Sequence, residues 1–182
     1  MLFMKNRRVL ILLGLMLSLA TYSCSAQEAE FEKQNLGLVS SELIEIGFPK
    51  PIGYVNDFEN ILTPEQEKKL TKLITLYQQK TTNEIVVVTI SSTEPYSDFD
   101  QYAVEMSNEW GVGKKEKNNG LTIVLSKTLK NVRISTGIGT KKALPDEVCK
   151  SIIDRFMVPK FKEGQYYEGI SQGLDELIKH WR

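Results

Sequence analysis

The sequence of 182 residues contains very little histidine and cysteine. The only histidine is His180, close to the C-terminus, which excludes histidine-based catalytic triads and zinc sites rich in histidine. The only cysteines are Cys24, in the leader described below, and Cys149. Cys149 therefore has no partner for an intramolecular disulfide. Because no base is placed to activate its thiol, we interpret Cys149 as a buried structural residue.

An excess of charge is also missing. The 23 Lys and Arg residues equal the 23 Asp and Glu residues in number, and three of the basic residues lie in a leader without acidic residues. The rest of the chain is therefore mildly acidic, and it has no basic field that would gather nucleic acid or anionic lipid. The sequence also lacks a Walker loop and a complete dinucleotide-binding fingerprint.

The N-terminus has the organisation of an export signal. Lys5, Arg7 and Arg8 precede an apolar run at residues 9–20. This run is long enough for the core of a signal peptide and too short for a transmembrane helix. The sequence therefore predicts an exported protein, whose mature domain lies outside the cytoplasm.

Two routes of processing remain open for this leader. Residues 21–24 resemble a lipoprotein box, in which the thiol of Cys24 would be the lipid attachment point and would tether the protein to the membrane. Residues 24–26 also fit ordinary signal-peptidase cleavage before Gln27, which would release a soluble product.

Composition divides the chain into an export signal (residues 1–26), a mixed and acidic tether (residues 27–48) and a single domain (residues 49–182). The domain begins at Pro49-Lys50-Pro51, because each proline fixes its own φ and restrains the residue before it. Within the domain, apolar periodicity, caps and breakers predict helices at 64–80, from Ser97 or Asp98 to Gly111, from Pro145 to Pro159, and at 165–181, and strands at 85–90, 121–125 and 132–136.

The order of these elements predicts the fold class. Strand, helix and strand over residues 85–125 form a βαβ unit, so the two strands should be parallel with a right-handed crossover. The connection at residues 126–131 is too short for a helix and predicts an antiparallel hairpin. We therefore expect an α/β fold, a three-layer α/β/α sandwich with a small, mixed, mainly parallel sheet.

Oxygen atoms dominate the chemistry that these residues offer. Carboxylates and amides gather near strand ends, and hard cations such as Ca²⁺ or Mg²⁺ prefer such ligands. Each has a structural alternative: Asp57 could form an Asx turn, Asp146 could complement a helix dipole, and Asn119 could belong to a tight turn before a strand.

A series of short motifs covers most of the exported domain, in order from Val55 to Leu177. They are Val55-Asn56-Asp57, Trp110-Gly111-Val112-Gly113, Asn119-Gly120-Leu121, residues 133–139, Leu144-Pro145-Asp146, and Pro159-Lys160-Phe161 followed by Tyr166 and Gly169. With these motifs the chain resembles a TPM domain, the family found in thylakoid lumen proteins, bacterial envelope proteins and a nematode receptor accessory protein.

The resemblance implies an exported or lumenal α/β/α sandwich that binds a divalent cation, with calcium the usual candidate. The ligands that it implies are Asp57, Asn119 and Asp146, with backbone around Gly137 and Gly139. We place this predicted site at the end of the sheet where strand 132–136 leaves into the glycine loop, and expect Asp57 to reach it from the N-terminal segment.

One residue departs from the family pattern. Relatives often have an acidic residue just after the Gly-x-Gly, where this chain has Lys141. The lysine would repel a metal ion.

Three functions follow as hypotheses. The first is a cell-envelope module that binds Ca²⁺ or Mg²⁺ and acts in binding or maintenance, with an envelope protein as partner. The second is a metal-dependent acid phosphatase of low specificity, an activity proposed for plant members of the family. The third is a metal-free protein-interaction domain, which follows if Lys141 abolishes the cation site.

Overall fold

The structure is a computed structural model that describes residues 47–181. The predicted export signal, including Cys24, and the predicted tether up to residue 46 lie outside the described residues. Phe48, which the sequence analysis assigned to the tether, belongs to the domain: its ring centroid lies 5.7 Å from that of Tyr96 and 5.1 Å from that of Tyr102. No helix between residues 47 and 181 has the length and apolarity needed to cross a membrane.

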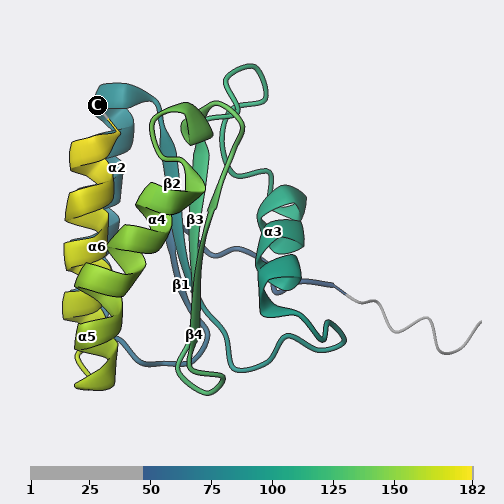
Figure 1. Ribbon diagram of the computed structural model, residues 1–182, viewed down its shortest axis with the longest axis vertical. Helices are drawn as coiled ribbons and strands as arrows, with labels where there is room; N and C mark the ends of the chain where they lie inside the picture. Colours follow the sequence, from purple (N-terminus) through teal and green to yellow (C-terminus); the bar gives the residue numbers. More distant parts are fainter. Residues whose placement is uncertain (1–46, 182) are drawn as a thin grey trace, which may run out of the picture. The chain divides into compact units, whose positions relative to one another are not determined.

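A four-stranded sheet forms the middle layer of the domain (Figure 1). Its strands lie in chain order: β1 (Val55–Asp57), β2 (Glu84–Thr89), β3 (Gly120–Ser126) and β4 (Asn131–Thr136). The first three strands are parallel, and β4 is antiparallel to β3. The sheet is therefore mixed and mainly parallel, as the sequence predicted.

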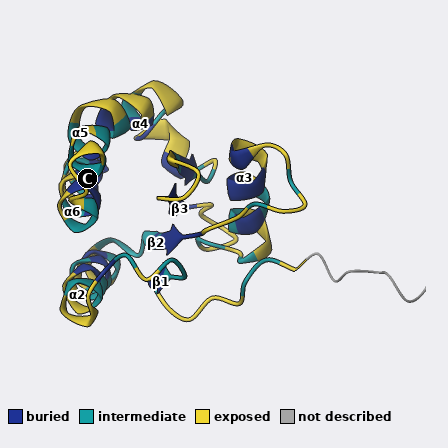
Figure 2. Ribbon diagram, turned by 90° about the horizontal axis from the view of Figure 1, so that it is seen from below, coloured by how far each residue is buried: buried dark blue, intermediate teal, exposed yellow. Residues whose placement is uncertain are grey.

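Helices cover both faces of the sheet (Figures 1 and 2). One face packs in a large apolar cluster with α2 (Pro64–Thr81), α4 (Asp146–Ile152), α5 (Val158–Lys162) and α6 (Tyr166–His180). Among the described residues, the other face packs against one helix, α3 (Phe99–Glu109), with Phe48, Phe58 and Tyr96 beside it, in a smaller cluster. This confirms the predicted three-layer sandwich.

The two helical crossovers between the parallel strands have opposite hands. The connection through α2 joins β1 to β2, and the connection through α3 joins β2 to β3. Both step across the sheet in the same direction, but they pass over opposite faces. One of them is therefore left-handed, an exception to the right-handed preference of parallel crossovers on which the predicted βαβ unit was based.

The first two helices begin where their caps predict. Thr63 and Gln66 form a capping box at the start of α2, and Pro64 occupies the first helical position. Asp98, not Ser97, caps α3 by accepting a hydrogen bond from the backbone N–H of Gln101 at 2.7 Å. These caps fix where the chain turns from each strand back across the sheet.

The prediction that Pro159 stops the third helix is wrong. The chain continues from α4 through a π-helical segment, η2 (Ile153–Met157), into α5, where Pro159 lies in the first turn. The N–H of Val158 bonds the carbonyl of Ile153, five residues back. Proline lacks an N–H, which the first turn of a helix does not need, so the wider π turn allows the helical path to continue past it.

Cys149 lies on the inward side of α4 and is buried, as predicted. Its Sγ is 3.7 Å from the carbonyl oxygen of Leu144. Burial, with a smaller contribution from the charge of Asp146, raises the pKa of the thiol to about 11. A thiol with so high a pKa is not a nucleophile near neutral pH.

Candidate functional site

The residues predicted to bind a cation lie at two ends of the sheet. Asp57 ends β1 and is in register with Thr89, the last residue of β2. Asn119 and Gly137 flank the opposite end, where Gly120 begins β3 and Thr136 ends β4. Since β3 has seven residues and a strand rises about 3.3 Å per residue, the two ends are about 20 Å apart. The expectation that Asp57 reaches the glycine loop is not met.

Asp57 organises the turn between β1 and α2. One carboxylate oxygen accepts the backbone N–H of Leu62 at 2.7 Å, and the other accepts the hydroxyl of Thr89. The hydroxyl of Thr89 in turn accepts the backbone N–H of Glu59 at 3.0 Å. Both oxygens of Asp57 therefore serve the turn, close to the structural role left open for it.

Asn119 is a buried amide whose hydrogen bonds are all within the domain. Its Oδ1 accepts the backbone N–H of Lys114 at 2.9 Å. Its Nδ2 donates to the carbonyl of Thr82 at 2.9 Å and to Oδ1 of Asn83 at 3.1 Å. The side chain thus ties the loop before β3 to the C-terminal end of α2.

Gly137 and Gly139 allow two backbone segments to cross in contact. The N–H of Gly137 donates to the carbonyl of Gly120 at 2.9 Å, and that of Gly139 donates to the carbonyl of Asn118 at 3.0 Å. A Cβ on Gly137 would lie 2.3 Å from the oxygen of Asn118, and one on Gly139 would lie 2.1 Å from the oxygen of Lys117. The carbonyl of Gly137 already accepts the N–H of Lys141 at 2.9 Å.

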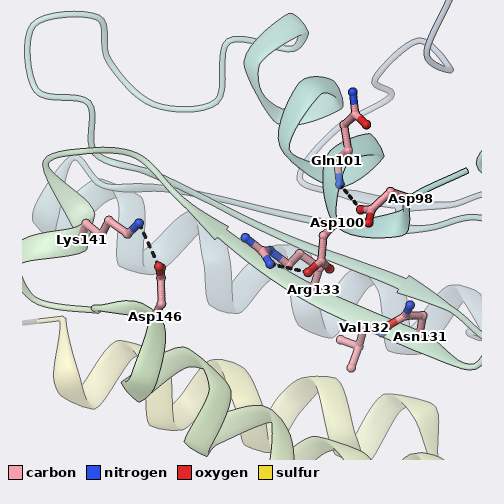
Figure 3. A network of polar contacts seen from close by, with 8 residues as sticks. All are labelled: Asp98, Asp100, Gln101, Asn131, Val132, Arg133, Lys141 and Asp146. Atoms are coloured by element: carbon pink, nitrogen blue, oxygen red, sulfur yellow. Dashed lines mark hydrogen bonds and ion pairs between the residues drawn. The ribbon is translucent and has the colours of Figure 1, made fainter. Parts of the chain in front are cut away.

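Asp146 begins α4 and pairs with Lys141 (Figure 3). The distance from Nζ of Lys141 to Oδ2 of Asp146 is 2.9 Å. The two side chains are 52% and 66% exposed, so the pair contributes little to stability. The predicted cation site would have needed the carboxylate of Asp146, which is instead paired with Lys141.

These contacts do not fit a bound divalent cation. The carboxylates of Asp57 and Asp146 lie on different elements at different ends of the sheet, and the oxygens of Asp57 and Asn119 already accept hydrogen bonds. Within residues 47–181, no three His, Cys, Asp or Glu side chains come together as a metal-binding group. His180 is exposed at the end of α6, and its Nδ1 lies 2.8 Å from the carbonyl of Glu176.

A polar cleft of about 200 Å³ lies between α3 and β4. Nη1 of Arg133 is 2.6 Å from Oδ2 of Asp100 on α3 (Figure 3). Nε of Arg133 and Oγ of the buried Ser135 have no hydrogen-bond partner among the described residues. A buried polar atom without a partner lowers the free energy of unfolding, so these two atoms make the cleft less stable than one with all its polar groups paired. The alternation of Val132, Arg133, Ile134 and Ser135 in the sequence could have indicated this polar face.

A groove follows the outer edge of β4, and we call it the edge groove. It consists of two adjoining hollows, about 470 and 530 Å³ in volume, which share Lys130, Asn131, Val132 and Val158. The smaller hollow contains carboxylates, each of which pairs with a lysine or arginine. Its charges are therefore balanced.

The larger hollow, which we call the lysine half, is cationic and apolar. Lys127, Lys130 and Lys162 line it, and no carboxylate is among its described lining residues. The rings of Phe161 and Tyr166 stack in its wall with centroids 5.6 Å apart. This site could not be predicted from the sequence, because only the fold brings the hairpin after β3 beside α5.

Three solved structures share this fold. The N-terminal domain of a P. gingivalis protein is 31% identical, with 70% of this chain and 80% of that chain covered and a TM-score of 0.64. The N-terminal domain of the cg2496 protein from Corynebacterium glutamicum is 12% identical, with 75% and 84% covered and a TM-score of 0.57. The BA42 protein from Bizionia argentinensis is 20% identical, with 69% and 88% covered and a TM-score of 0.57.

No curated protein matches the sequence. The family model described as the TPM domain matches residues 55–180. This match includes every strand and helix named above, and the P. gingivalis domain supports it at 31% identity. The chain therefore belongs to the TPM domain family.

Proposed function

We propose that this chain is an exported TPM domain of the cell envelope that binds another envelope protein through its edge groove. The observation that carries the proposal is the lysine half, where three lysines and two stacked aromatic rings surround an open hollow. It lies beside Leu125 and Ser126, at the carboxyl ends of the parallel strands, where α/β sheets usually bind their ligands. Attachment to the membrane by lipid on Cys24 is part of the proposal and rests on the leader sequence.

Binding of this kind does not require a metal ion. Ca²⁺ or Mg²⁺ binding is implied by the resemblance, but Asp57, Asn119 and Asp146 are engaged elsewhere, as described above. The phosphatase hypothesis depends on the same metal ligands, and no described feature favours it. A protein-interaction module is the hypothesis that the geometry supports best.

Site-directed photo-crosslinking in living cells tests the proposal. The chain, with its own leader, carries a photo-reactive residue in place of Lys162 in the lysine half or, as control, in place of Lys69, which is exposed on α2. After irradiation and fractionation, we expect a discrete adduct in the envelope fraction from position 162 and none from position 69. Equal adducts from both positions, or none from position 162, would contradict the proposal.

A further inference from the structure

The backbone of β4 has an open outer edge. β4 is the last strand of the sheet, and no described segment pairs with its outer side. Because the N–H of Gly137 bonds Gly120, the alternation of an antiparallel ladder directs the backbone groups of Val132, Ile134 and Thr136 away from β3. The N–H of Val132 is instead 3.0 Å from Oδ1 of Asn131, its own neighbour (Figure 3). An exposed strand edge is a template on which another strand can pair.

The edge groove runs along this open edge. Its two hollows meet at Asn131 and Val132, so the space beside the strand extends from Ile134 to the hairpin. β1, at the other edge of the sheet, has only three residues, whereas β4 has six. The groove therefore offers an extended segment both a strand to pair with and room for its side chains.

The charge of the groove indicates what such a segment carries. Lys130 and Lys162 are exposed and line the lysine half, and neither takes part in an ion pair among residues 47–181. The adjacent rings of Phe161 and Tyr166 favour a large apolar side chain. Successive side chains along a strand point to opposite faces. A segment that pairs with β4 would therefore carry acidic residues at every second position and apolar residues at the positions between them.

We infer that the edge groove binds an extended polypeptide segment that pairs with β4 and places acidic side chains against Lys130 and Lys162. The inference rests on the proposed function and specifies the chemistry of the partner. The backbone pairing supplies affinity, and the lysines and aromatic rings select the segment.

A charge-exchange experiment tests the selection. The full-length chain is titrated, by fluorescence anisotropy, into a labelled peptide of about eight residues that alternates glutamate with valine and phenylalanine. The comparison peptide has lysine in place of glutamate. We expect the acidic peptide to bind roughly tenfold tighter at low salt, with less difference at high salt.

The Lys130→Glu, Lys162→Glu double variant should reverse this preference. The matched control, Lys68→Glu with Lys69→Glu on the exposed face of α2, makes the same change in net charge and should leave the preference intact. A melting curve establishes that each variant is folded. An unchanged preference in the double variant, or equal binding of both peptides to the unaltered chain, would overturn the inference.

The backbone pairing is tested separately. N-methyl groups are placed on either of the two alternating sets of peptide amides, because only one set can donate to β4. One methylated set should bind at least tenfold more weakly than the other. Equal binding of the two sets would overturn the strand pairing.

Two further outcomes separate the inference from the proposed function. If crosslinking from position 162 captures an envelope protein but the peptides show no charge preference, the inference fails and the proposed function stands. If sedimentation of the full-length chain reveals a dimer that the Lys130→Glu, Lys162→Glu variant dissociates, a second copy occupies the groove and the inference fails.

Discussion

At the scale of single residues, two buried hydroxyl groups near β4 differ in their partners. Oγ of Ser135 has no hydrogen-bond partner among the described residues, and the residue is buried, with 8% of its surface exposed. Oγ1 of the fully buried Thr140 donates to the carbonyl of Gly120 at 2.9 Å. The first group costs stability and the second contributes to it.

Ser135→Ala should therefore raise the free energy of unfolding by about 1 kcal/mol, because it removes a buried group without a partner. Thr140→Val, of similar shape to threonine, should lower it by about 1 kcal/mol, because a formed hydrogen bond is lost. Urea denaturation of both variants measures the two changes. A destabilised Ser135→Ala protein would show that the hydroxyl has a partner in solution.

The individual carboxylates also explain why the predicted cation site was not assembled. The sequence identified Asp57 as a turn residue or a ligand, and in the structure it closes the turn before α2. β1 pairs in parallel with β2, and this pairing places Asp57 at the end of the sheet away from the glycine loop. β1 has only three residues, too few for the sequence to predict the pairing.

At the scale of elements, the glycine loop after β4 is a joint between two backbone segments. Gly137 lies against the oxygen of Asn118, and Gly139 lies against that of Lys117. The motif glycines that carry the family resemblance meet at this joint, since a Cβ on Gly113 would lie 2.4 Å from the nitrogen of Gly120. Their role here is close packing of backbone.

Gly137→Ala should lower the free energy of unfolding by about 2 to 3 kcal/mol, because the new Cβ collides with a carbonyl oxygen held in the joint. Gly53→Ala is the matched control. A Cβ at Gly53 meets nothing within 4 Å, so the change should be neutral or stabilising by up to about 1 kcal/mol. Thermal melting of both variants distinguishes a packed joint from an open loop, in which Gly137→Ala would be tolerated.

Most elements could be predicted from the sequence because their signals are local. The capping box of Thr63 and Gln66 and the apolar run of β2 each specify an element without knowledge of the rest of the chain. The passage of the chain through Pro159 could not be predicted in this way. It depends on the π-helical segment η2, whose backbone hydrogen bonds span five residues instead of four, and the local sequence does not indicate this.

At the scale of the whole molecule, thermal stability tests whether the predicted cation ligands, which do not come together in the structure, bind an ion. A cation that binds only the folded domain would stabilise it by about 2.7 kcal/mol at a hundredfold excess over its Kd. For a domain of this size, that corresponds to a rise in Tm of roughly 8 °C or more.

We expect millimolar calcium or magnesium to change the Tm of the EDTA-treated protein by less than about 1 °C. The reason is that the described residues at the two ends of the sheet do not form a cation site that would stabilise the folded domain. Sodium chloride at equal ionic strength is the control. A rise of several degrees with calcium alone, abolished in Asp57→Ala or Asp146→Ala, would establish the cation site and contradict the metal-independent proposal.

The order of the strands has a consequence for how the domain assembles during synthesis. β1 to β4 lie side by side in the order in which a ribosome or a translocation channel releases them, so each new strand pairs with one that has already emerged. Closure of the core comes last. Tyr77 in α2 donates its hydroxyl proton to the carbonyl of Trp181 at 2.5 Å, and the Trp181 side chain is buried. Until α6 has emerged, the part of the apolar face that packs against α6 therefore stays open to chaperones and to aggregation.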